Sequence, residues 1–71
     1  MKTIENFENE ALAIINNKEL TDYIRNMALS RLMTDMERLF NIPLLANKEW
    51  EQNNVEVINL YRMIADSRNF N

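Results

Sequence analysis

Three residue types are absent from this chain and a fourth is scarce. Its 71 residues include no cysteine, no histidine, no glycine and only one proline. Without cysteine, the chain has no disulfide, no thiolate nucleophile and no cysteine-bound metal centre. Without histidine as well, a zinc ion would need an all-carboxylate shell, which suits that metal poorly. We therefore expect a protein with no metal and no cofactor.

The lack of glycine also removes the glycine-rich loops whose backbone approaches phosphate groups closely. Asparagine is the residue that next most readily takes the left-handed backbone conformation. It is found where helices are expected to break, at Asn16, Asn17, Asn41, Asn53, Asn54 and Asn69.

The overall composition is that of an ordered, folded chain. Hydrophobic residues make up 46% and charged residues 27%, and the formal net charge is −3 with both signs interspersed. The length predicts a single helical domain over residues 1–71 with a thin core. No apolar run is long enough to cross a membrane and no signal-peptide pattern is visible, so the expected location is the cytoplasm.

Two amphipathic helices are predicted in the first half of the chain. The first spans 3–17, with Thr3 as its N-cap. The second spans 21–41, with Thr21 as its N-cap, Asn41 as a left-handed C-cap and Pro43 beyond it. Ile24 and Met27 widen the apolar surface of the second helix near its start, so we expect neighbours on at least two of its sides.

The second half is predicted to hold a connection, a short helical turn and a third long helix. Leu44 and Leu45 are apolar enough that we expect the connection to be anchored on the core. A helical turn follows at 47–52, with Asn47 as its N-cap, and its Trp50 should cover one end of the core. The last helix spans 54–68 with Asn54 as its N-cap, and Phe70 is a candidate anchor for the tail. The predicted fold is an all-α, small three-helix bundle with an additional short helical turn, which dimerisation would complete.

A stripe of apolar residues in the second helix has two interpretations. It contains Leu29, Leu32, Met33, Met36, Leu39 and Phe40. The first interpretation is the core of the bundle. The second is an interface with a second copy or another protein, favoured by the small size of the chain and by the adaptability of methionine at binding surfaces. On the second interpretation the partner-binding residues are Met27, Leu29, Leu32, Met33, Met36 and Trp50.

The charged and hydroxyl residues give little sign of catalysis. Acidic residues near the first helix, such as Glu5 and Glu8, suit its positive N-terminal end and the solubility of its outer face. Asp35 has the spacing to pair with Arg31 and Arg38 on one helix. Arg25 points near the apolar stripe, so it should either extend to solvent at the helix end or meet a carboxylate. The serines have no histidine to activate them.

We therefore expect a small non-enzymatic protein–protein interaction module, a regulator or inhibitor that docks through an apolar, methionine- and leucine-rich helical face. Its partner is another protein or a second copy of itself, without nucleic acid or membrane. One alternative is a nucleic-acid-associated protein that acts as a dimer, although the net charge is negative. The other alternative is a structural subunit of a larger assembly.

Overall fold

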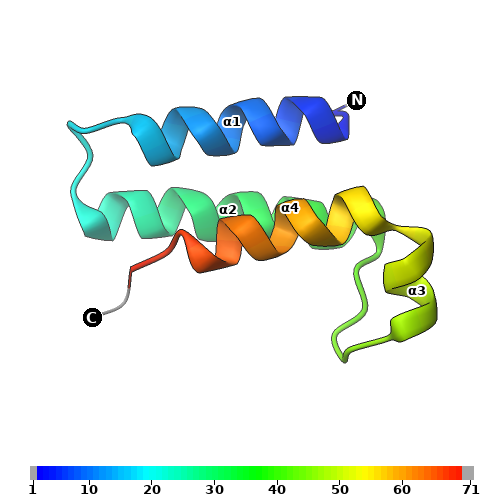
Figure 1. Ribbon diagram of the computed structural model, residues 1–71. Helices are drawn as coiled ribbons and strands as arrows, with labels where there is room; N and C mark the ends of the chain where they lie inside the picture. Colours follow the sequence, from blue (N-terminus) through cyan, green and yellow to red (C-terminus); the bar gives the residue numbers. More distant parts are fainter. Residues whose placement is uncertain (1, 70–71) are drawn as a thin grey trace.

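The described part of the chain forms four helices, and the three long ones pack side by side (Figure 1). In the computed structural model, which describes residues 2–69, they are α1 (Ile4–Asn16), α2 (Asp22–Phe40), α3 (Lys48–Asn53) and α4 (Val55–Asp66). α2 runs antiparallel to both α1 and α4, so α1 and α4 point the same way. The predicted all-α bundle of three long helices and one short one is confirmed.

The predicted N-caps hold three of the helices in place. The Thr3 hydroxyl accepts a hydrogen bond from the Asn6 backbone N–H at 3.2 Å, and the Asn6 side chain accepts one from the Thr3 N–H at 3.0 Å. Thr21 accepts from the first turn of α2 at 3.2 Å, and Asn47 does the same for α3 at 3.0 Å. Each bond satisfies an amide that the start of a helix leaves without a partner.

The other predicted helix ends are only partly confirmed. Asn41 ends α2 in the left-handed conformation, with φ 54° and ψ 47°, as predicted. Asn54 precedes α4, but its side chain makes no capping bond and donates instead to the carbonyl of Trp50 at 2.8 Å. α4 ends at Asp66 rather than 68. Phe70, the candidate tail anchor, lies outside the described residues.

The core lies between α1, α2 and α4. Its buried members are Phe7, Ala11, Leu29, Leu32, Met33, Met36, Val57, Leu60 and Ile64. Phe7 and Phe40 meet edge to face with their ring centroids 5.6 Å apart. The Cα atoms extend over 39 × 28 × 16 Å, so the bundle is thin and every long helix keeps a solvent-facing side. No helix among residues 2–69 has the length and apolarity needed to cross a bilayer.

Candidate interaction surfaces

Most of the apolar stripe of α2 is inside the bundle, whereas Leu39 is exposed, at 36%. Leu29 and Met36 are fully buried, and Leu32 and Met33 are 5% and 7% exposed. Of the six predicted partner-binding residues, the structure brings these four together in the core of the same chain. Trp50 packs against that core from α3 and is partly buried, which confirms its predicted position. Met27 is the one that lies well exposed, at 45%.

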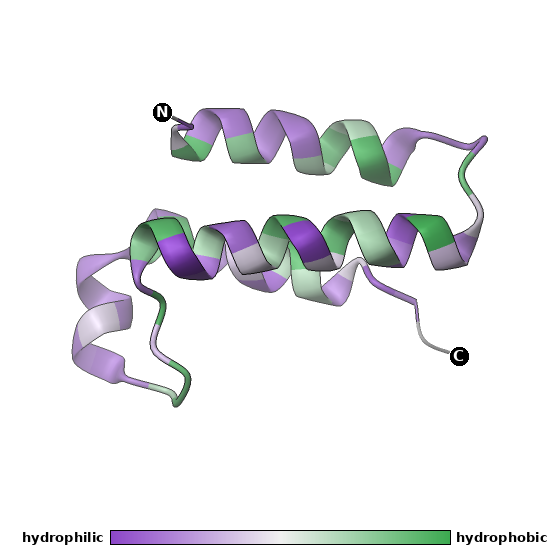
Figure 2. Cartoon of the chain, turned by 180° about the vertical axis from the view of Figure 1, so that it is seen from behind, coloured by the Kyte–Doolittle hydropathy of each residue, from purple (hydrophilic) through white to green (hydrophobic). Residues whose placement is uncertain are grey.

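Met27 is exposed because of the geometry of the helix. Nine residues separate it from Met36, which at about 100° per residue places the two side chains on opposite sides of α2. Tyr23 and Ile24, in the first turn, are 72% and 50% exposed. α2 therefore has a buried inner face and an outer face whose N-terminal half is apolar. Seen from behind, α2 lies in front of α4 (Figure 2).

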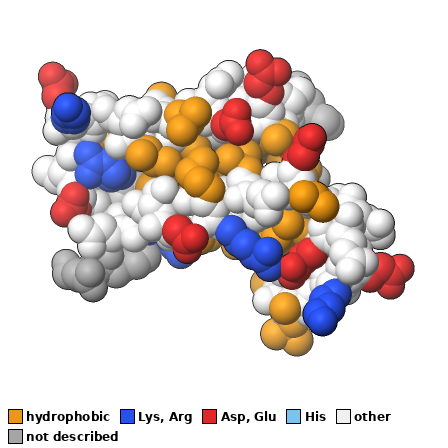
Figure 3. Space-filling model, in the orientation of Figure 1, with side chains coloured by type: hydrophobic (Ala, Val, Ile, Leu, Met, Phe, Trp, Pro, Cys, Tyr) orange, Lys and Arg blue, Asp and Glu red, His pale blue; other side chains and the backbone are white. Residues whose placement is uncertain are grey.

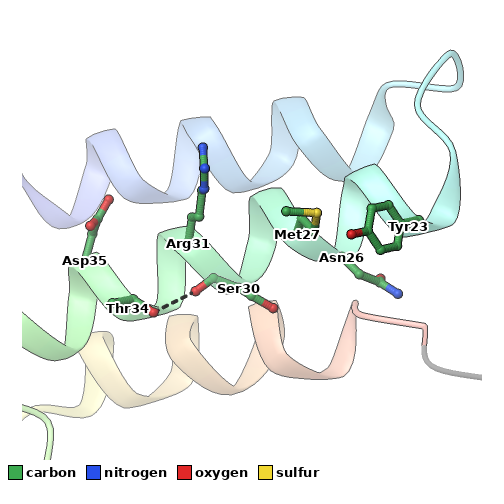
Figure 4. Close-up of a pocket in the computed structure, with 7 residues that line it drawn as sticks. All are labelled: Tyr23, Asn26, Met27, Ser30, Arg31, Thr34 and Asp35. Atoms are coloured by element: carbon green, nitrogen blue, oxygen red, sulfur yellow. Dashed lines mark hydrogen bonds between the residues drawn. The ribbon is translucent and has the colours of Figure 1, made fainter.

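The outer face of α2 carries a shallow, open hollow of about 760 Å³ (Figure 4). Its lining residues are Tyr23, Asn26, Met27, Ser30, Arg31, Thr34 and Asp35. They come from successive turns of one helix, so the hollow is a feature of the α2 surface and not a cleft between elements. Tyr23 and Ile24 are not among the predicted partner residues. Met27 follows Tyr23 by four residues and Ile24 by three, so the three side chains share one side of the helix. This spacing is the sequence signal that identifies Tyr23 and Ile24 as members of the exposed face.

The charged residues of this hollow do not form the ion pairs that the sequence predicts. Among residues 2–69, Asp35 forms no ion pair with Arg31 or Arg38, although the spacing favours one. All three side chains are exposed, and such pairs in water gain little over hydration. Arg31 and Asp35 are therefore both open to a partner. The Thr34 hydroxyl donates to the Ser30 carbonyl at 3.1 Å (Figure 4).

Arg68 and Asn69, the last described residues, are held on α2 beside the hollow. The Asn69 backbone N–H donates to Asn26 Oδ1 at 2.8 Å, and Asn26 Nδ2 donates to the Asn69 carbonyl. One side-chain amide thus pairs with both backbone groups of a single residue, as a neighbouring strand would. Arg68 Nη1 also donates to the Ser30 hydroxyl at 3.2 Å. These contacts fix the C-terminal segment along the edge of the outer face.

Arg25 meets a carboxylate, which was one of its two predicted outcomes. Its Nη1 lies 3.1 Å from Asp22 Oδ1. Its Nη2 also donates to the carbonyls of Asn17 and Leu20, at 2.7 and 3.1 Å. The planar guanidinium therefore binds the turn between α1 and α2 and the first turn of α2 together.

The connection after α2 corrects another prediction. Leu44 and Leu45 are 98% and 82% exposed, so they are not anchored on the core. Ile42 and Pro43 are the half-buried residues of this connection, and Ile42 packs against the core. Because these two residues meet the bundle, the two that follow project from it. A small cavity of about 180 Å³ lies between this connection, α3 and α4.

Tyr61 links α4 to α2 through its hydroxyl, which donates to Glu37 Oε2. Burial is the main cause that raises the pKa of Tyr61, to about 12, and the hydrogen bond and negative charge of Glu37 add to it. The Tyr61 phenol therefore stays neutral and connects α4 to α2 through this hydrogen bond.

Among the residues that the structure describes, no three acidic side chains gather closely enough to hold a metal ion.

Comparisons with known proteins find no relative of this chain. The chain matches no family model, no curated protein and no solved structure.

Proposed function

We propose that this protein is a non-enzymatic protein–protein interaction module, a small regulator or inhibitor that docks on its partner through the outer face of α2. One observation carries the proposal. The first two turns of α2 expose Tyr23, Ile24 and Met27 on the side away from a core that already holds Leu29 and Met36. Each of these apolar side chains keeps 45% or more of its surface exposed to solvent.

The chemistry of the face suits a docking site. Tyrosine and arginine are enriched among the residues that dominate binding energy at interfaces, and methionine adapts its shape to different partners. Tyr23, Met27 and Arg31 line one hollow of α2, with apolar contact at one end and charge at the other. The partner in this proposal is another protein or a second copy of the chain, in the cytoplasm.

The experiment compares variants of this face in a binding assay. Tagged protein on a resin is exposed to native lysate of its source organism, and the eluted complex is weighed by light scattering. Met27→Asp should abolish the stoichiometric partner, because it places a charge in the apolar part of the face. Gln52→Asp, which adds the same charge on exposed α3, should leave the partner bound. Equal retention by both variants would show that this face does not dock.

Circular dichroism of both variants keeps the result interpretable. Met27 is half exposed, so the loss of its side chain should leave the helix content unchanged. Leu32→Asp or Met36→Asp would not serve, because each would place a charge in the core and unfold the chain.

A further inference from the structure

A second apolar surface lies on the opposite side of the bundle, between the parallel helices α1 and α4. The groove has a volume of about 560 Å³, and its floor is formed by Ile4, Leu60 and Met63. Ile4 and Met63 are partly buried and pack against the core, so the floor is an open edge of that core. Figure 3 shows an apolar band across the middle of this face.

The rim of this groove is acidic. Glu5 and Glu8 lie on the α1 side and Glu56 on the α4 side, and all three are exposed. Neither lysine nor arginine is among the described residues that line it. None of the three carboxylates takes part in an ion pair with another described residue, because the acidic partners of the ion pairs within 2–69 are Glu10, Asp22 and Glu51.

The helix ends explain only part of this charge. α1 and α4 begin at the same end of the bundle, and Glu5 and Glu56 lie in their first turns (Figure 1). Each helix N-terminus carries the equivalent of about half a positive charge, which favours a carboxylate there. Two such termini balance about one negative charge. Three carboxylates therefore leave the rim negative, and Glu8 lies beyond the first turn.

We propose that this α1–α4 groove binds an amphipathic helix of another protein whose apolar stripe is flanked by lysine or arginine. A helix laid between α1 and α4 would cover the floor with its apolar side chains and place basic side chains beside Glu5, Glu8 and Glu56. This is the helix-in-groove mode of recognition, with charge complementarity choosing the partner. The bound helix becomes a fourth long helix of the bundle.

A second copy of the chain is a poorer occupant of the groove. Its exposed basic helical surface is the outer face of α2, which carries Arg31 and Arg38. Seating that face in the α1–α4 groove joins two different surfaces, and such heterologous contacts produce rings or open filaments instead of a closed pair. The groove also lies on a different face from the proposed α2 docking site, so either proposal can fail without the other (Figures 1 and 2).

The test uses a fluorescent synthetic helix of leucine and lysine with helical spacing, and a matched peptide with glutamate in place of lysine. The full chain should bind the lysine peptide and not the glutamate peptide. A groove variant with Glu5→Gln, Glu8→Gln and Glu56→Gln should weaken lysine-peptide binding by roughly tenfold. A control variant with Glu10→Gln, Glu19→Gln and Glu49→Gln has the same net charge, lies outside both proposed surfaces and should change it less than about twofold.

Three results would overturn the proposal. Equal weakening by the groove and control variants would mean that only net charge attracts the peptide. Equal binding of the glutamate peptide would mean that the rim does not select, and no binding of the lysine peptide would mean that the groove accepts no such helix. Amide chemical-shift mapping should also place the lysine peptide on Ile4, Leu60 and Met63. Met27→Asp should leave this binding unchanged, which separates the result from that of the α2 face.

Discussion

The hydroxyl of Tyr61 on α4 donates a hydrogen bond to the carboxylate of Glu37 on α2, across 24 residues of sequence. This contact joins the last long helix to the central one outside the apolar core. It requires a protonated phenol, so it makes the stability of the bundle sensitive to alkaline pH.

The pH dependence of stability is the first prediction. The pKa of Tyr61 rises from 10 to about 12 in the folded chain, which means that folding favours the protonated form. Its contribution should be fully present below about pH 10, where the unfolded phenol is also protonated, and should be lost as the pH rises through about 12. Denaturant titrations at several pH values between 8 and 12 measure this loss.

Tyr61→Phe is the control for that titration. At neutral pH it should cost about 1 kcal/mol of unfolding free energy, because the hydrogen bond to Glu37 is lost. Its disadvantage should shrink as the pH rises from about 10 to about 12, because ionisation of the unfolded phenol then opposes folding of the native protein but not of the variant. If native and variant proteins lose stability in parallel over that range, Tyr61 is not the group responsible.

The second prediction concerns the turn between α1 and α2. Arg25→Ala removes two hydrogen bonds to carbonyls and a contact with Asp22, and should lower the unfolding free energy by about 1–2 kcal/mol. Arg25→Lys keeps the charge but not the planar fork, so it should recover less than half of the loss. Full recovery by lysine in thermal unfolding would show that charge alone matters here.

The third prediction separates the two sides of α2. Met36→Ala should cost about 2–5 kcal/mol, because it leaves a cavity in a fully buried site. Met27→Ala should change the unfolding free energy by no more than about 0.5 kcal/mol, because that side chain is already 45% exposed. Urea denaturation of the two variants makes the comparison. Similar losses in both would contradict the assignment of inner and outer faces.

The fourth prediction addresses the exposed leucines. Replacing Leu44 and Leu45 together by serine should leave stability within about 0.5 kcal/mol of the native chain and reduce the binding of apolar dyes. Ile42→Ser, two residues earlier, should destabilise the chain because Ile42 packs against the core. A marked loss of stability in the double serine variant would mean that these leucines pack in solution.

Much of the fold follows from local sequence. Thr3, Thr21 and Asn47 cap helices where the sequence places them, and Asn41 takes the left-handed conformation two residues before Pro43. These features are predictable because a cap or a left-handed residue satisfies backbone groups within a few positions of itself. The failure of Asn54 to cap α4 has a different cause. Its amide meets the carbonyl of Trp50, a contact that exists only after α3 forms.

The candidate interaction residues were less predictable, for a physical reason. Spacing shows that Leu32 and Met36 share a face with each other and not with Met27, but it does not show which face meets another helix. Leu44 and Leu45 look like core residues by composition, yet they project from the bundle because Ile42 and Pro43 already occupy the contact with it. Burial therefore depends on which residues the tertiary packing places against the limited surface of the core.

The sequence alone determined that this chain is helical, where its helices begin, and that it has neither thiol nor imidazole chemistry, because these properties depend on residue identity and on contacts within one or two turns. The tertiary structure decided that most of the methionine and leucine stripe of α2 lies inside, that Tyr23, Ile24 and Met27 lie outside, and that Glu5, Glu8 and Glu56 border one groove. These relationships join residues far apart in the chain, and only the packing of α1 and α4 against α2 brings them about.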